Sequence, residues 1–176
     1  MTGREFLNAL ANGKRDLLRE LLDILKETGA SHCLVGGLAV NAYAEPVVSL
    51  DVDVVVAGDA LERVAVAAEG RGLRVERFEH SVNVSGEGSD LRVQLQTDPR
   101  YQGFLARATD ATVLGYPMRV AAKQDVLQGK VWAWSDASRR RSKRHKDLAD
   151  IARLVESDPE LGRALPDAVR RALGEG

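Results

Sequence analysis

Two aspartates, Asp51 and Asp53, stand one residue apart in an otherwise apolar stretch, LDVDVVV. The valines predict a β-strand, and because side chains alternate along a strand, both carboxylates should point to the same face. Burying a carboxylate is costly unless a cation pairs with it. Two carboxylates on one strand can hold Mg²⁺ or Mn²⁺ through oxygen ligands, so we predict a metal site at Asp51 and Asp53. The alternative is an edge strand with solvated carboxylates, and the surrounding valines argue against it.

A pair of glycines, Gly36 and Gly37, follows the apolar residues CLV and precedes a short helix-like stretch. Glycines at a strand-to-helix turn let backbone N–H groups approach a phosphate, and the helix N-terminus favours negative charge. We therefore expect this pair to bind nucleotide phosphates, with a tight packing turn as the alternative. Ser49, just before the aspartates, is a further candidate for contact with a phosphate or with metal-bound water, unless it is an ordinary strand serine.

The elements that must position these residues follow from the periodicity of the sequence. Leucines at helical spacing predict a helix over 17–25 that ends near Gly29. Alternating and β-branched residues predict strands over 31–37, 49–57, 73–79, 81–85 and 90–97, and a hairpin over 112–120 centred on residues 115–117. Further helices are expected over 38–44, over 60–70 with Asp59 as its cap, and over 124–134 and 146–156.

Together these elements predict an α/β (α+β) fold. We expect a mixed central sheet of about four to six strands with flanking helices and a helical C-terminal region. Residues 1–121 should form the core with its N-terminal helix, and residues 122–176 should pack on that core as a helical region of one compact unit.

The composition narrows the class of protein. The chain has 176 residues, of which 44% are hydrophobic and 29% charged, and this mix is typical of a globular domain. Its formal net charge of −1 gives no global field that would attract nucleic acid or a membrane. The single cysteine, Cys33, excludes an internal disulfide and a thiolate metal cluster. No apolar run is long enough to span a bilayer, and we expect a cytoplasmic protein without a membrane partner.

The glycine and aspartate motifs resemble those of the nucleotidyltransferase superfamily that includes DNA polymerase β. That family combines a hydrophobic residue and Gly-Gly with a spaced Asp-x-Asp, which VGG and LDVDV match here. A later segment, KRHKDLADIARL, resembles one in the minimal nucleotidyltransferases of bacterial toxin–antitoxin and abortive-infection systems. The likeness spans roughly residues 31–155.

The resemblance implies an activity and its cofactors. Members transfer a nucleoside monophosphate from a nucleoside triphosphate (NTP) to a hydroxyl of a protein, an RNA or a small molecule, and they use two divalent metal ions. A toxin or antitoxin partner is implied by the nearest subgroup. By the same likeness, Lys130 and Lys146 in the helical region are candidates to reach the triphosphate.

Two positions depart from the family pattern. The family usually carries a third acidic residue on a later strand, and the matching position here is Gln94. A glutamine can coordinate a metal weakly through its carbonyl oxygen, but it cannot accept a proton. An arginine that often precedes Asp-x-Asp is replaced by Val47 and Val48. A catalytically degenerate module that binds nucleotide, or neutralises a partner as an antitoxin does, is therefore the alternative to an active enzyme.

A basic run precedes the last long helix. It contains Arg139, Arg140, Arg141, Lys143, Arg144 and Lys146. Such a run is often only a solvated surface, but it can also bind phosphates of an NTP or of RNA. For Asp147 and Asp150, which follow on the same helix, we expect ion pairs with neighbouring arginines.

Overall fold

A seven-stranded mixed sheet forms the centre of the molecule, in a computed structural model that describes residues 2–174. The strand order is β3-β4-β5-β2-β1-β7-β6. The strands are β1 (His32–Val35), β2 (Asp51–Val56), β3 (Arg74–Arg77), β4 (Ser81–Ser85), β5 (Arg92–Gln96), β6 (Thr109–Val113) and β7 (Tyr116–Val120). Strand β2 runs parallel to β5 and antiparallel to β1, so the aspartate strand lies in the middle of the sheet.

The sheet confirms the predicted fold class but has more strands than expected. We expected about four to six strands, and the hairpin formed by β6 and β7 brings the sheet to seven because β7 pairs with β1. Its turn lies at residues 114–115, between the paired residues Val113 and Tyr116, slightly earlier than predicted. The predicted strands β4 and β5 also form an antiparallel hairpin.

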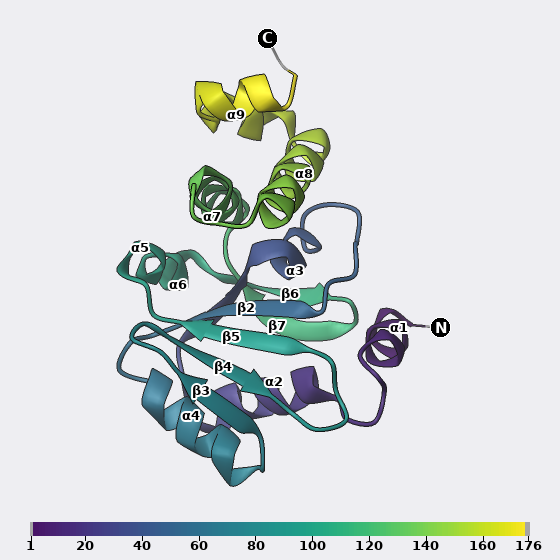
Figure 1. Cartoon of the computed structure of the whole chain (residues 1–176), viewed down its shortest axis with the longest axis vertical. Helices are drawn as coiled ribbons and strands as arrows, with labels where there is room; N and C mark the ends of the chain where they lie inside the picture. The colour runs from purple at the N-terminus through teal and green to yellow at the C-terminus, as the bar shows by residue number, and fades with distance from the viewer. Residues whose placement is uncertain (1, 175–176) are drawn as a thin grey trace.

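One face of the sheet is covered by α2 (Leu17–Glu27) and α4 (Leu61–Gly70), which lie below it in Figure 1. Helix α2 buries five of its residues, and Asp16 caps it by accepting a hydrogen bond from the Arg19 backbone. The predicted cap of α4 is wrong. The cap position is Ala60, and no side chain caps the helix, because α4 begins one residue later than the sequence suggested.

The opposite face carries α3 (Gly36–Val40), the short α5 (Pro99–Gln102) and α6 (Phe104–Arg107), and the long helices α7 (Lys123–Ser135) and α8 (Arg141–Ser157) (Figure 1). Helix α3 includes the two glycines that we had placed in a turn before it. The chain ends with the 3₁₀-helix η1 (Pro159–Ala164) and α9 (Asp167–Ala172), and α1 (Gly3–Leu10) lies beside the sheet. No helix among residues 2–174 has the length and apolar character to cross a membrane.

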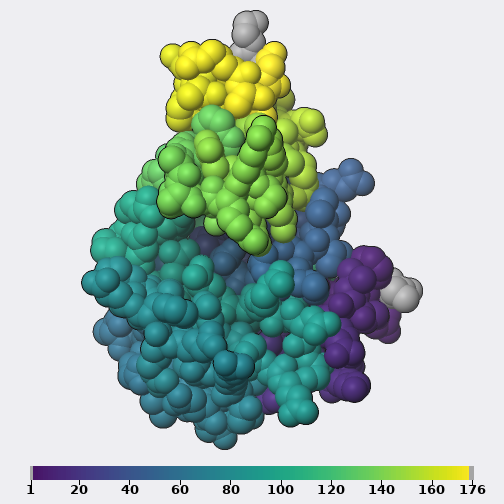
Figure 2. Space-filling view, in the orientation of Figure 1, coloured from purple at the N-terminus to yellow at the C-terminus, as the bar shows by residue number. Residues whose placement is uncertain are grey.

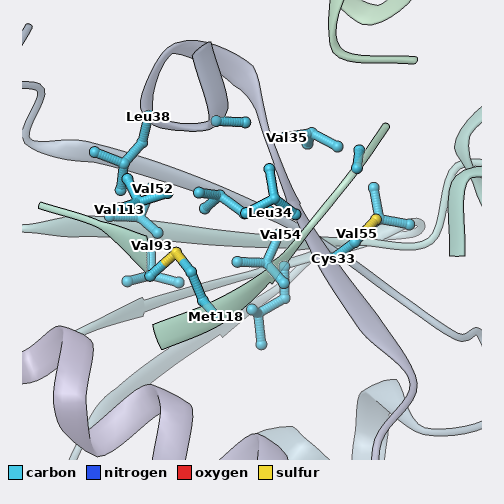
Figure 3. Packing of buried hydrophobic residues seen from close by; sticks show 14 of the residues in the cluster. Cys33, Leu34, Val35, Leu38, Val52, Val54, Val55, Val93, Val113 and Met118 are labelled. Atoms are coloured by element: carbon cyan, nitrogen blue, oxygen red, sulfur yellow. The ribbon is translucent and has the colours of Figure 1, made fainter. Parts of the chain in front are cut away.

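The core lies in the central strands. Leu34, Val54, Val93 and Met118 come from four different strands and pack together in Figure 3. Cys33 is fully buried there, and burial raises the pKa of its thiol to about 12. Removing apolar surface from water contributes about 25 cal/mol per Å², so this packing fixes the strands rigidly and, with them, the positions of the aspartates on β2.

Candidate active site

The strand register sets the neighbours of the two aspartates. On the β5 side, Asp51 lies opposite Arg92 and Asp53 lies opposite Gln94. On the β1 side, Asp53 lies opposite Val35, the residue before the glycine pair. The elbow between β1 and α3 is therefore held directly beside Asp53, although Gly36 and Asp53 are 17 positions apart in the chain.

Each of the two positions favours glycine for a different steric reason. Gly36 has a φ of +72°, and a Cβ added to it would lie 2.5 Å from Asp53 Oδ2. Only glycine fits this left-handed backbone next to the carboxylate. At Gly37 a Cβ would meet Asp150 Oδ2 at 3.3 Å and Lys130 Nζ at 3.7 Å. Gly36 therefore faces the aspartate, and Gly37 lets α3 approach a charged pair on the far side.

Asp51 is held by two cations. Arg92 Nε donates to Asp51 Oδ1 at 2.7 Å, and Lys143 Nζ donates to Asp51 Oδ2 at 2.7 Å. Partial burial opposes ionisation of Asp51, but these two hydrogen bonds outweigh it and lower its pKa to about 2. Ser49 Oγ accepts a hydrogen bond from the Asp51 backbone at 3.2 Å. Both carboxylate oxygens of Asp51 are thus engaged.

Asp53 differs from Asp51 in having no such partner. Among residues 2–174, no side chain makes a hydrogen bond or an ion pair with its carboxylate, which faces the cavity. Desolvation raises the pKa of Asp53 above its ordinary value, and the positive charge of Lys130 offsets this only in part. A desolvated carboxylate without a partner is stabilised by any cation that binds beside it.

A buried charge cluster, formed by Lys130, Asp147 and Asp150, lies behind the glycine elbow. Lys130 Nζ is 3.0 Å from Asp147 Oδ1 and 2.7 Å from Asp150 Oδ2. Arg139 adds a second ion pair to Asp147, and Arg153 adds one to Asp150. The cluster joins α7 to α8 and places a lysine in the wall of the cavity.

The aspartates open into a cavity of about 930 Å³. Its walls come from β2, β4 and β5 on the sheet side and from α5, α7 and the start of α8 on the other. Figure 2 shows the corresponding hollow between the green helices and the teal strands. Tyr101 and Trp132 pack edge-to-face with ring centroids 5.2 Å apart and line one wall. Charged and polar side chains make up much of the remaining lining.

The structure places the predicted site residues in two groups. Gly36, Asp51, Asp53, Gln94 and Lys130 line the cavity. Gly37, Ser49 and Lys146 lie close by but outside the set of described residues that line it. Lys146 Nζ donates to Ser49 Oγ at 3.2 Å. Lys146 of α8 therefore contacts the start of the aspartate strand through Ser49, which also accepts a hydrogen bond from the Asp51 backbone. Asp98, four residues beyond Gln94, lines the cavity, but its carboxylate pairs with Arg100.

Three cations shape the site, and the sequence alone did not place any of them beside the aspartates. Arg92 was not singled out, although it has the same strand parity as Gln94 and so shares its face. Lys143 and Arg139 were predicted only as members of the basic run, and both line the cavity. The expected partners of Asp147 and Asp150 were arginines. These are present, but the central partner is Lys130 from α7.

The donor set decides what metal the site can take. Among residues 2–174, no three His, Cys, Asp or Glu side chains gather as a metal cluster. Asp53 supplies a carboxylate without a partner, and the Gln94 amide stands beside it. Mg²⁺ is often bound by one or two carboxylates together with substrate phosphates. The residues therefore fit a divalent cation that shares its ligands with a nucleotide.

Comparison with known proteins agrees with this geometry. No protein-family model and no curated protein matches the sequence. The antibiotic-resistance factor ANT(2'')-Ia superposes with a TM-score of 0.64 at 16% identity, over 90% of this chain and 91% of that chain. The lincosamide antibiotic adenylyltransferase LnuA gives 0.56 at 13%, over 78% and 95%.

A third similar structure is an antigenic nucleotidyltransferase-like protein from Paracoccidioides brasiliensis. Its TM-score is 0.57 at 16% identity, over 94% of this chain and 88% of that chain. At such identities the likeness shows the fold. The chain has the DNA polymerase β-like nucleotidyltransferase fold that its glycine and aspartate motifs predicted.

Proposed function

We propose that this protein transfers a nucleoside monophosphate from an NTP to a hydroxyl. The observation that carries the proposal is the contact of Gly36 with Asp53, which brings the glycine elbow and a carboxylate without a partner into one cavity on a nucleotidyltransferase fold. A triphosphate along the elbow would lie next to the one carboxylate of the pair that is free to share a cation with it.

The residues have distinct roles in this proposal. Asp53, with Asp51 beside it, would hold Mg²⁺ or Mn²⁺, and the bound cation would neutralise phosphate charge. Arg92, Lys143 and Arg139 line the cavity and place fixed positive charge around the phosphates. Catalysis then comes from positioning and electrostatics. Lys130 lies in the wall of the cavity but is almost fully buried, so it acts on the phosphates through the field of its charge.

The transfer step is a displacement at the α-phosphorus. A bond forms between the acceptor oxygen and the α-phosphorus, the bond to the β-phosphate oxygen breaks, and pyrophosphate leaves. Gln94 cannot take the proton of the acceptor hydroxyl. We therefore expect that proton to pass to water.

A small hydroxylated molecule is the acceptor we favour over a protein or an RNA. One similar structure is ANT(2'')-Ia in complex with adenylyl-2''-tobramycin, and another is LnuA bound to lincomycin. A cavity of about 930 Å³ is large enough for a nucleotide and a small acceptor together. Membership of a toxin–antitoxin pair rests on the segment KRHKDLADIARL alone and stays a prediction.

The experiment is a transfer assay with α-labelled NTPs. The purified protein, with Mg²⁺ or Mn²⁺ and each of the four NTPs, is incubated with a cell extract that is then separated into small-molecule, RNA and protein fractions. We expect label in the small-molecule fraction with wild-type protein and none with Asp53→Asn. Label in another fraction changes the acceptor class, and no label in any fraction contradicts the proposal.

A second candidate function is a nucleotide-binding module without catalysis, and Gln94 is the observation that favours it. The amide stands opposite Asp53, where a third carboxylate would lie. This alternative predicts that the protein binds an NTP with Mg²⁺ but transfers no label in the assay described above. Label transfer by the wild-type protein that is lost in a folded Asp53→Asn protein rejects it.

A further inference from the structure

The two aspartates are chemically unequal, and this inequality determines how many metal ions the site can hold. The inference rests on the proposed function, because it concerns the cation that the nucleotide would bring. Asp51 makes two close contacts with cations, and Asp53 makes none among the described residues. A site for two metals needs both carboxylates as ligands.

Each carboxylate oxygen of Asp51 already accepts a hydrogen bond from a cation. Arg92 reaches Oδ1 from the neighbouring strand, where the register places it directly opposite. Lys143 reaches Oδ2 from α8 on the other side of the cavity. The three side chains together carry one net positive charge. This trio attracts phosphate and repels a second divalent cation.

The register of β5 places a cation opposite Asp51 but a neutral residue opposite Asp53. The residue opposite Asp53 is Gln94, which is neutral and cannot neutralise a dication. Gln96 follows on the same face and is neutral as well. The other carboxylates that line the cavity have partners. Asp98 pairs with Arg100, Glu76 pairs with Arg74, and Asp136 makes no ion pair but accepts two hydrogen bonds from Ser138. Negative charge without a partner is therefore concentrated at Asp53.

We propose that the site holds a single divalent cation, at Asp53, and that Arg92 and Lys143, held on Asp51, supply the positive charge that a second metal would otherwise bring to the phosphates. Asp51 is then a positioning residue for these two cations. In this role it holds Lys143 of α8 in the wall of the cavity.

The test is the spectrum of bound Mn²⁺ in the presence of an NTP analogue that cannot be cleaved between its α- and β-phosphates. Two Mn²⁺ ions about 3.5–4 Å apart, the spacing of two-metal sites, are exchange-coupled and give an electron paramagnetic resonance spectrum distinct from that of an isolated ion. We expect the wild-type complex to show the isolated-ion spectrum alone. A coupled pair, or no Mn²⁺ bound to the protein, overturns the inference.

Variants show whether the trio excludes the second ion. The double variant Arg92→Gln, Lys143→Gln frees Asp51, and we expect it to show the coupled-pair spectrum. Arg100→Gln is the matched control, since Arg100 also lines the cavity and pairs with an aspartate other than Asp51; it should keep the isolated-ion spectrum. A double variant that still binds one ion, with native circular dichroism, overturns the role given to Arg92 and Lys143.

The outcome is separable from that of the proposed function because no turnover is involved. An isolated-ion spectrum combined with no transfer to any acceptor rejects the transferase activity and leaves the single-cation assignment standing. Transfer by a protein that shows the coupled-pair spectrum supports the transferase activity and rejects the single-cation assignment.

Discussion

Two regions of this molecule use the same kind of ion pair for different ends. On the cavity side, Lys143 lies 2.7 Å from Asp51 with side chains 33% and 28% exposed. In the buried charge cluster, Lys130 lies 3.0 Å from Asp147 with side chains 7% and 2% exposed. The pairs have nearly the same geometry and differ mainly in their access to water.

This difference decides which pair a ligand can rearrange. Separating a partly solvated pair costs little, because water replaces the lost partner. Separating a buried pair leaves a charge that nothing solvates. The cluster behind the elbow therefore holds α7 and α8 in place, while the pairs of Asp51 can respond to a phosphate. The charged residues near the aspartates therefore fall into a structural group, which is buried, and a group that a ligand can contact.

The largest effect on stability should come from breaking the ion pairs of the buried charge cluster. Asp147→Ala leaves Lys130 buried with one partner fewer and removes the ion pair of Arg139. We expect it to lower the free energy of unfolding by about 3–5 kcal/mol, measured by urea denaturation. Asp51→Ala is the control on the cavity side and should cost less than about 1 kcal/mol. Equal losses in both variants would contradict the distinction.

Asp53→Asn should separate activity from stability. We expect transfer to fall by about 10³-fold or more, since the carboxylate that holds the cation is gone. Without metal or nucleotide, however, the variant should be more stable than wild type at pH 7. The folded-state pKa of Asp53 is raised, so its contribution to stability is present below the unfolded value of about 4 and is lost as the pH rises through the folded value.

The measurement for that prediction is the free energy of unfolding of both proteins in a metal chelator across the acidic to neutral range. The gap in favour of Asp53→Asn should open as the pH rises. A gap that instead favours wild type at neutral pH would mean that Asp53 has a cationic partner in solution.

Gly36→Ala should be intermediate in size. The added Cβ meets the Asp53 carboxylate, and the residue must keep a φ of +72°. A left-handed conformation at a residue other than glycine costs about 1–3 kcal/mol, so we expect a loss of that order in thermal or urea unfolding, with weaker nucleotide binding. Gly58→Ala is the matched control, because nothing lies within 4 Å of a Cβ there. Equal tolerance at both positions rules out the close approach.

The smallest effect should come from Lys143→Ala. The free energy of unfolding at neutral pH should fall by less than about 1 kcal/mol, because both partners are partly exposed. The pKa of Asp51 is lowered to about 2, so the stability from its pairs is present above the unfolded pKa of about 4 and lost as the pH falls through 2. The curves of wild type and variant against pH should therefore converge below pH 2; a gap that persists there contradicts the assignment.

The sequence predicted those parts of the site that depend on local order. Alternation placed Asp51 and Asp53 on one strand face, and the glycine pair marked the elbow. It could not predict which cation meets which carboxylate, because that depends on strand register and on a helix far along the chain. Arg92 reaches Asp51 only since β5 pairs with β2 in parallel. Lys143 reaches it across 92 positions of sequence.

The fold shows the same limit. Strands and helices followed from periodicity, but the sheet gained strands because the β6–β7 hairpin joins it through β1, a long-range pairing with no local signal. The predicted cap of α4 was wrong because the helix begins at Leu61, which makes Ala60, and not Asp59, the cap residue.

The most direct test of the account is a crystal structure with Mn²⁺ and a non-cleavable NTP analogue, using the anomalous signal of manganese. The account predicts one peak within ligand distance of Asp53, with the triphosphate running past Gly36 and the side chains of Arg92 and Lys143 on the phosphate side. A nucleotide bound away from the elbow, or manganese remote from Asp53, would contradict it.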